Sequence, residues 1–395
     1  MLQEGQPISQ IPASGVDLTL RRRTVAPCLS NGAAVRSLAT LGVQIINTAS
    51  ANCNATREDM CQYIADAVET LRLQVLCEPN YAMELSSGGV KKVVLDVNDK
   101  FTGRQWNLAS IGMKEAWQAL KGRPLREVVQ AVIDSGVDFR HEDLAGNIFS
   151  YENCSHGYNF YDDNNDVSDA EVLGIAGILG AATNNGIGVA GIAPVKIMPV
   201  KVFGSGPSGS GADIVKSLDY TIENGADLST HSYGGKTDSI LGIAIETAAL
   251  RGHLVVSTRA LISASISNTH VPGRSKLKCH VNYGPYVDIA APGDRVFTTK
   301  PGNKYGSFSG TSFAVPHVAG AAALLSGLGL SGADVRRSLL ASVGDLTDRS
   351  GHKIADYGRL NVAKAIEVAL TKPTVAPKER RSVGNCQEVS GNGVN

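Results

Sequence analysis

Long apolar runs alternate with helical patterns over most of the chain after residue 128. Four runs rich in valine, isoleucine and alanine are typical of buried strands: residues 128–133, 195–203, 253–257 and 286–292. Residues 212–225 and 239–252, which lie between them, carry helical patterns. Strands and helices that alternate at this spacing favour right-handed βαβ units. We therefore predict an α/β fold with a parallel central sheet and helices on both faces.

The chain before residue 96 predicts a separate, small α+β unit. Residues 41–46 form a β-rich run, and Thr56 to Asp59 resembles a helix capping box, with apolar residues at helical spacing after it. Residues 72–78 and 81–85 are strand-like. The predicted organisation is a disordered segment 1–38, a small domain 39–95, a large domain 96–370 and a polar tail 371–395.

Composition narrows the classes of function. The 395 residues include 37 basic and 37 acidic side chains, so the net charge is zero. A balanced chain has no overall field to hold nucleic acid, and we expect none as a partner. No apolar run is long enough to span a membrane. The 43 glycines and low aromatic content favour a tightly turned α/β enzyme over a coiled coil or solenoid.

The cysteines and sequons bear on the compartment in which the protein folds. Seven cysteines match no metal-binding spacing. Asn54 and Asn153 begin Asn-x-Ser/Thr sequons, which slightly favour secretion. The N-terminal residues lack the apolar core of a secretory signal.

A glycine-rich stretch resembles a dinucleotide-binding fingerprint. Gly204, Gly206 and Gly209 follow an apolar strand, and Asp227 comes about twenty residues later. Pro207 lies where backbone amides would have to face a pyrophosphate, and Gly211 continues the glycines toward the helix. An extended Gly/Ser surface loop is the preferred interpretation.

Two distant segments carry the main candidate chemistry. Asp134 ends the buried strand 128–133, at the edge where α/β sheets place their sites. Ser312 opens an apolar helix, where free backbone amides can stabilise a developing negative charge. Alone, Asp134 is compatible with a turn aspartate and Ser312 with a helix cap. Together they predict an active site.

The motifs around these residues resemble those of the subtilisin-like serine peptidases, the subtilase family. AVIDSGVDFRHEDL resembles the aspartate motif, and GTSFAVPHVAGAAALL resembles the serine motif. NNGIGVAGIAP, GADLSTHSYGG and YGPYVDIAAPG resemble the connecting segments, so the resemblance covers roughly residues 95–370. It implies a subtilisin-like fold, and it implies that the unit ending CEPNYAMEL is an inhibitory propeptide.

The resemblance also implies roles for individual residues. Ser312 would be the nucleophile, and Asp134 the acid that orients the base. The substrate backbone would pair with two edges, and the second edge would also form one wall of the P1 pocket. The residues of these edges are Gly209, Ser210 and Gly211 on the first and Ser232, Tyr233 and Gly234 on the second.

A structural calcium ion is the cofactor that the resemblance implies. Oxygen ligands alone suit calcium on physical grounds. The matching positions are Gln105, Asp143, Thr183, Asn185, Ile187 and Val189, three of them through backbone carbonyls.

The chain departs from the family pattern at two catalytic positions. Glu171 stands where the family has its general-base histidine, and Leu261 stands where the family has its oxyanion asparagine. Glu171 itself is a poor base for a serine at neutral pH, because its ordinary pKa is about 4.3. His231, at the end of a strand that leads to the pocket, is an alternative base, although a strand-end histidine beside the cleft is the preferred interpretation.

Three hypotheses of function follow. The first is a serine endopeptidase that acts through an acyl-enzyme and is strongly impaired by these replacements. The second is an inactive pseudoprotease that binds peptides or its own propeptide. The third is a dinucleotide-binding dehydrogenase, which rests on the glycine-rich stretch alone. Family habit further implies a secreted monomer that acts on peptides or proteins.

Overall fold

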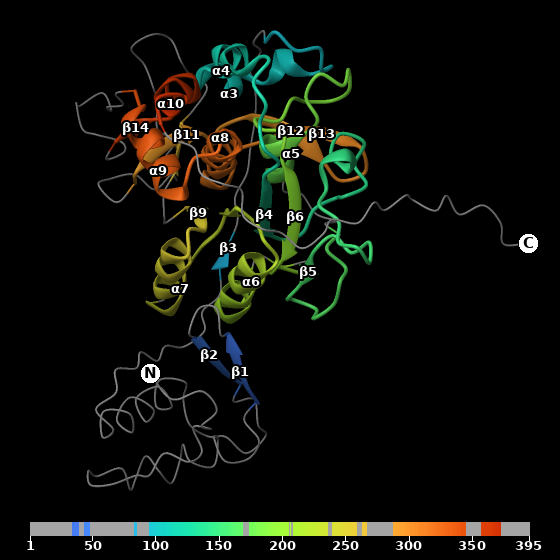
Figure 1. Ribbon diagram of the computed structural model, residues 1–395. Coiled ribbons are helices and arrows are strands. Elements are labelled where there is room, and N and C mark those ends of the chain that lie inside the picture. The colour runs from blue at the N-terminus through green and yellow to red at the C-terminus, as the bar shows by residue number, and fades with distance from the viewer. Residues whose placement is uncertain are drawn as a thin grey trace, which may run out of the picture.

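The computed structural model places most of the predicted large domain. The described residues are 34–38, 43–47, 83–84, 95–168, 174–204, 206, 208–235, 239–258, 263–266, 287–344 and 357–372. Figure 1 shows a central sheet enclosed by helices, with the pair of strands nearest the N-terminus set apart from it.

A five-stranded parallel sheet forms the centre of the domain and confirms the predicted α/β class. Its strand order is β5-β6-β4-β7-β9, and all four pairs of neighbouring strands are parallel. The strands are β4 (Val129–Asp134), β5 (Tyr158–Asn159), β6 (Lys196–Lys201), β7 (Leu228–His231) and β9 (Leu254–Ser257). All six residues of β4 are buried, as expected for a strand covered on both faces.

The two faces of the sheet enter two separate apolar clusters. Val132 packs in one cluster with α5 (Ile175–Gly180) and α8 (Val315–Gly327). Ala131 and Ile133 belong to the other cluster, with α6 (Gly211–Glu223) and α7 (Ser239–Leu250). Adjacent residues of a strand point to opposite faces, so this alternation gives one layer of helices on each side (Figure 1).

Helices at the start and end of the domain add a further layer beyond α8, because α10 contacts α4, α9 and α8. These helices are α3 (Trp106–Ser110), α4 (Met113–Leu120), α9 (Gly332–Ala341) and α10 (Val362–Ala369). Val362 donates its amide proton to the carbonyl of Ile111, which joins the two ends of the domain directly.

Smaller strand pairs complete the structure. A parallel three-stranded sheet joins β10 (Ser263–Ile266), β11 (Ile289–Pro292) and β14 (Gly358–Arg359), and β12 (Val296–Lys300) forms a hairpin with β13 (Lys304–Phe308). The predicted strand 286–292 is therefore present as β11, but in this smaller sheet. No helix among the described residues is long and apolar enough to cross a membrane.

In the N-terminal region, the described residues form three short strands. β1 (Ala34–Leu38) and β2 (Val43–Asn47) are antiparallel partners, and β3 (Met83–Glu84) pairs with β8 (Gly234–Gly235). β2 overlaps the predicted run 41–46, and β3 lies within the predicted strand 81–85. The predicted helix after Thr56 and the strand 72–78 lie outside the described residues, and the domain boundaries stay predictions.

Candidate active site and candidate calcium loop

Asp134 ends the middle strand of the sheet and is almost completely buried. It is 1% exposed, and its Oδ1 accepts a hydrogen bond from the amide of Ser135 at 2.8 Å. Its own carbonyl accepts from the amide of Val202, which follows β6. The carboxylate is therefore held at the carboxyl edge of the sheet, where the sequence placed it.

The turn after Asp134 requires a glycine. Gly136 has φ +117°, and a Cβ there would lie 2.6 Å from the carbonyl oxygen of Val167 and 2.9 Å from that of Ser168. The ammonium of Lys201 donates to the carbonyls of Ser135 and Ser168. These contacts fix the Asp134 turn against the segment that leads toward residue 171. Glu171 itself lies outside the described residues.

Ser312 lies in a 3-10 turn, Thr311–Phe313, directly before α8, and is 5% exposed. The sequence predicted that it would lie in the first turn of the helix, whereas the α-helix begins at Val315. Pro316 early in α8 is tolerated because the first amides of a helix have no acceptor within it. Every residue of α8 is buried, so the helix anchors the serine turn in the core.

His317 on α8 is structural. Its Nδ1 donates to the carbonyl of Phe313 at 2.8 Å, and its Nε2 therefore accepts from the side-chain amide of Asn107, also at 2.8 Å. Burial lowers the pKa of His317 to about 4.

The end of β7 brings a second group of residues to the edge that carries Asp134. His231 on β7 lies opposite Ile133 on β4. Asp134 and Ser232, the next residues along the chain, therefore lie at the same level of the sheet edge. Burial, and to a smaller extent the carboxylate of Asp134, raises the pKa of the Tyr233 phenol well above its usual range. The structure therefore brings Asp134, Ser232 and Tyr233 together.

A buried chain of hydrogen bonds runs inward from Tyr233. The carbonyl of Ala226 accepts from Nδ1 of His253 (3.2 Å), so with both rings neutral His253 Nε2 accepts from the Ser229 hydroxyl (3.0 Å). Ser229 in turn accepts from Nε2 of His231 (2.9 Å), and Nδ1 of His231 accepts from the Tyr233 hydroxyl. Sequence reasoning did not foresee this chain; polar residues at alternate positions 229, 231 and 233 were its only signal.

This series of hydrogen bonds gives His231 a structural role. Burial, with His253 nearby, lowers the pKa of His231 to about 3, so the ring is neutral at physiological pH. Both of its nitrogens are engaged, and the ring is 2% exposed. These contacts do not favour His231 as the alternative general base.

The first expected substrate edge is only partly extended. Gly209 forms an antiparallel bridge with Phe203, and a Cβ on Gly209 would lie 2.6 Å from the Phe203 ring. The Ser210 side chain caps α6 by accepting from the amide of Asp213 at 3.3 Å, and Gly211 is the first residue of that helix. Gly209 and Ser210 are therefore the members of this edge that precede the helix.

The second edge is already paired with another part of the chain. Glu84 lies opposite Gly234, and Met83 lies opposite Gly235, in antiparallel register. Residues 83 and 84 come from the segment that the sequence predicts as a propeptide. Leu261, at the expected oxyanion position, lies outside the described residues.

The candidate calcium residues meet around Asp143. Its side chain is fully buried, with Oδ2 accepting from the amide of Val189 and Oδ1 from the Asn185 side chain, both at 2.8 Å. Burial, and to a smaller extent Asp99, raises the pKa of Asp143. The hydrogen bonds from Val189 and Asn185, and to a smaller extent the nearby His141, oppose this shift of the pKa.

The backbone of the loop fits a cation bound by oxygen. Among the described residues, no hydrogen bond reaches the carbonyls of Thr183, Ile187 or Val189, although the carbonyls of Gly188, Ala190 and Gly191 accept one each. The carboxylate of Asp143 and these three carbonyls are the ligand types that calcium prefers. The carboxamides of Asn185 and Gln105 each use both of their polar atoms, Asn185 with Asp143 and the Ile187 amide, and Gln105 with the backbone of Ala190. Asn185 therefore contacts a candidate ligand directly, whereas Gln105 contacts a residue outside the candidate set.

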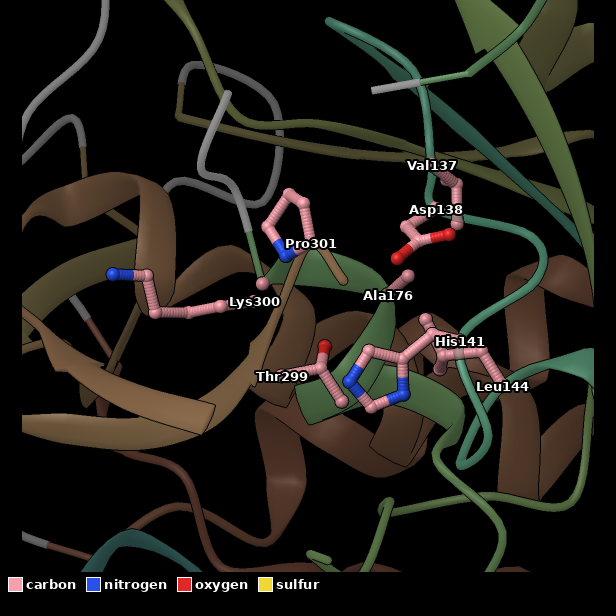
Figure 2. A pocket seen from close by; sticks show the side chains of 9 residues that line it. Val137, Asp138, His141, Leu144, Ala176, Thr299, Lys300 and Pro301 are labelled. Carbon is pink, nitrogen blue, oxygen red and sulfur yellow. The ribbon is translucent and has the colours of Figure 1, made fainter. Parts of the chain in front are cut away.

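A shallow hollow lies beside the Asp134 turn (Figure 2). The carboxylate of Asp138 accepts from the amide of Gly302, and His141 Nε2 bonds to the carbonyl of Lys304. Figure 2 shows the ammonium of Lys300 pointing away from the hollow. Asp138 and His141, two polar side chains that line the hollow, are therefore engaged in hydrogen bonds with the surrounding loops. The lining residues are Val137, Asp138, His141, Leu144, Gly174, Ala176, Thr299, Lys300 and Pro301.

Comparisons with known proteins decide the family. The model of the subtilase family, Peptidase S8, matches residues 126–281 and 274–359. The chain belongs to the subtilase family. It is 31% identical over 329 residues to the thermophilic serine proteinase of Bacillus sp. (strain AK1), a match that covers 79% of this chain and 78% of that protein.

Two further comparisons agree with this result, one in sequence and one in fold. Thermitase of Thermoactinomyces vulgaris is 32% identical over 282 residues, or 68% of this chain and 97% of thermitase. The crystal structure of fervidolysin from Fervidobacterium pennivorans, a keratinolytic enzyme related to subtilisin, aligns with a TM-score of 0.70 at 20% identity. That alignment covers 91% of this chain and 60% of fervidolysin and supports the fold. The family assignment leaves the dinucleotide-binding hypothesis without support.

Proposed function

We propose that this subtilase is a serine endopeptidase in which Ser312 is the nucleophile and Asp134 orients the base. The supporting observation is the placement of both residues within the family's motifs. Asp134 is buried at the end of the central strand, and Ser312 lies in the turn anchored by α8. Ser312 would attack the peptide carbonyl to give a tetrahedral intermediate, which would expel the amine and leave an acyl-enzyme. Water would then hydrolyse the acyl-enzyme and release the acyl group.

Glu171 and Leu261 set the level of the proposed activity. In subtilisin, loss of the catalytic histidine costs about 10⁶ in kcat, and loss of one oxyanion donor costs about 10²–10³. These losses need not multiply, because the groups act as a unit. We therefore propose that hydrolysis by this chain is strongly impaired.

The pairing of β3 with β8 favours a second function. Gly234 belongs to the proposed substrate edge, and it already holds an antiparallel strand from the N-terminal segment. Backbone pairing of this kind supplies affinity without catalysis. We propose that residues 39–95 act as a propeptide for the same cleft, and that a non-cleaving form of the protein would bind peptides or this propeptide.

Calcium is the proposed structural cofactor. Asp143, Asn185 and the carbonyls of Thr183, Ile187 and Val189 would hold the ion, and Gln105 would brace the loop from outside. When bound, the ion would compensate the buried charge of Asp143 and stabilise the fold. The catalytic steps proposed for Ser312 do not pass through it.

The proposed setting is outside the cell, as a monomer that acts on peptides or proteins. Cys154 is disulfide-bonded, and disulfides persist mainly in oxidising compartments. The two sequons point the same way.

Intact mass tests the proposed reaction. The purified full-length protein would be incubated with calcium beside a Ser312→Ala variant, and both would be treated with a fluorophosphonate. Cleavage within residues 85–105, which removes the N-terminal segment, supports a working nucleophile if it occurs in the parent and not in Ser312→Ala. A fluorophosphonate adduct found only on the parent supports the same conclusion. An uncut and unlabelled parent contradicts the peptidase and supports the binding function. The binding function then requires measurable affinity for a peptide of residues 78–86.

A further inference from the structure

We propose that Asn153 is an N-glycosylation site on an exposed turn of the peptidase domain. This proposal is independent of catalysis at Ser312. It begins from the sequon Asn153-Cys154-Ser155, which has no part in the proposed reaction. The sequon at Asn54 lies outside the described residues, so the structural argument concerns Asn153 alone.

Backbone hydrogen bonds hold the sequon in a tight turn. The amide of Cys154 donates to the carbonyl of Tyr151, and the amide of Tyr151 donates to the carbonyl of Ser155, both at 2.9 Å. Cys154 adopts the left-handed conformation with φ 62°, which closes the turn. Asn153 and Cys154 are exposed. The acceptor residue is therefore open to solvent on a defined loop, as a bulky surface glycan requires.

The side chains of the sequon are arranged around the Asn153 amide. Its Oδ1 accepts from the Ser155 hydroxyl at 2.8 Å and from the Ser155 amide at 3.1 Å. Both bonds use the oxygen, and Nδ2 has no hydrogen-bond partner among the described residues. The nitrogen that would carry the sugar is thus the unengaged atom of the side chain.

The modification is a simple group transfer from a polyprenyl-diphosphate oligosaccharide. A bond forms between Nδ2 of Asn153 and the anomeric carbon of the sugar, and the bond from that carbon to the diphosphate oxygen breaks. The diphosphate leaves with the electron pair, and Nδ2 loses one proton. A glycosyltransferase of the secretory route supplies both the donor and the base.

The neighbouring cysteine indicates that the required compartment is available. Cys154, the middle residue of the sequon, is disulfide-bonded. Disulfides form in the oxidising compartments that secreted proteins pass through. In eukaryotic cells the same route carries out N-glycosylation, so both modifications of adjacent residues have one source.

The turn can carry a glycan without strain because its contacts with the domain lie on either side of the acceptor. Phe139 packs against the ring of His156 with centroids 4.7 Å apart, and Nδ1 of His156 lies 3.0 Å from both the Ser150 hydroxyl and the Phe149 carbonyl. Residues 149, 150 and 156 therefore anchor the turn. Asn153 lies at its exposed centre.

Mass spectrometry of the secreted full-length chain tests the site. The chain would be produced with a secretory leader in eukaryotic cells, and a reporter sequon in a C-terminal tag would report entry into the glycosylating compartment. Enzymatic removal of N-glycans in heavy-oxygen water converts each modified asparagine to a labelled aspartate. We expect this label at residue 153 in the parent and in Ser155→Thr.

Two substitutions on the exposed turn make the result specific. Asn153→Gln and Ser155→Ala should each abolish the label at position 153, and Asn54→Gln should leave it in place. An unlabelled Asn153 in chains whose reporter sequon is labelled overturns the proposal. A label at Asn153 that persists in Ser155→Ala would show that the sequon does not direct the modification, and this result also overturns the proposal. Either result leaves the peptidase proposal unaffected.

Discussion

The carboxamide of Gln105 exchanges two hydrogen bonds with the backbone of Ala190, 85 residues away. Nε2 donates to the Ala190 carbonyl at 2.8 Å, and Oε1 accepts from the Ala190 amide at 2.9 Å. Gln105 is 1% exposed. The start of the predicted large domain is thus tied to the end of the candidate calcium loop by these two hydrogen bonds.

Gln105→Glu should lower the free energy of unfolding by about 1–3 kcal/mol, because the buried carboxylate keeps the acceptor and leaves the Ala190 carbonyl unpaired. Urea unfolding with and without calcium measures the loss. Gln118→Ala, which removes one hydrogen bond to Asp96 on the exposed surface, should change stability by less than about 0.5 kcal/mol. If calcium restores the full stability of Gln105→Glu, the residue is a ligand and the brace interpretation is wrong.

Chelation of calcium should lower the melting temperature of the full-length protein by several degrees or more. The ion would bind only the folded loop around Asp143 and would therefore stabilise the folded state. Asp143→Asn removes the charged ligand, so its melting temperature should no longer respond to a chelator. A parent protein that melts at the same temperature with and without chelator removes the calcium assignment.

The central sheet could be predicted because strands covered on both faces appear in the sequence as apolar runs. β7 is the exception. Its residues Ser229, Thr230 and His231 are polar, yet all are buried, because Thr230 bonds to Gln130 across the strands and the other two belong to the Tyr233 chain. Hydrophobic pattern alone does not mark such a strand.

The candidate site was predicted unevenly for a similar reason. Asp134 and Ser312 stand in highly specific motifs, and the structure places both in buried positions. Long-range pairings leave no such signal: neither the bonds of Gln105 to Ala190 nor the bonds of Lys201 to Ser135 and Ser168 can be inferred from local sequence. They depend on the completed fold.

Stability should fall as the pH is lowered below about 6.5, the ordinary pKa of histidine. The pKa is about 3 for His231 and about 4 for His317 in the folded protein, so the unfolded chain takes up protons first. Each ring should cost about 1.4 kcal/mol per pH unit until its folded pKa is reached. The stability contributed by the neutral rings is therefore fully present only above about pH 6.5.

Substitution of His231 isolates one part of this pH dependence. Between about pH 7.5 and about pH 5, His231→Leu should lose about 1–2 kcal/mol less stability than the parent, because one buried ring no longer titrates. Tyr233→Phe keeps both rings of the chain and should keep the parent slope. Urea unfolding at the two pH values measures the difference. Equal slopes in His231→Leu and the parent contradict a buried neutral His231.

Gly136→Ala should destabilise the domain by about 1–3 kcal/mol, because a side chain is strained at φ +117° and its Cβ would collide with the Val167 carbonyl. Gly146→Ala is the matched control, since a Cβ there meets nothing within 4 Å. Thermal unfolding of the two variants beside the parent measures the difference. A Gly136→Ala protein as stable as Gly146→Ala shows that the Asp134 turn rearranges freely.

Introducing a histidine and an asparagine at the two positions proposed to lack the family's catalytic groups should raise peptide hydrolysis by orders of magnitude. Glu171→His would return a base with a pKa near neutrality, and Leu261→Asn would return a donor for the oxyanion. Most of the gain should need the histidine, because the corresponding loss in subtilisin is about 10⁶ in kcat against about 10²–10³ for an oxyanion donor. Initial rates on a peptide substrate compare the parent, each single variant and the double variant.

Ser312→Ala in the double variant separates a restored subtilase reaction from any other source of activity. It should return hydrolysis to the parent level, because the restored base would have no nucleophile to activate. A double variant no faster than the parent, while folded and calcium-responsive, would locate the defect elsewhere. The segment 261–283, which begins at the proposed oxyanion position, would then be the next part of the chain to test.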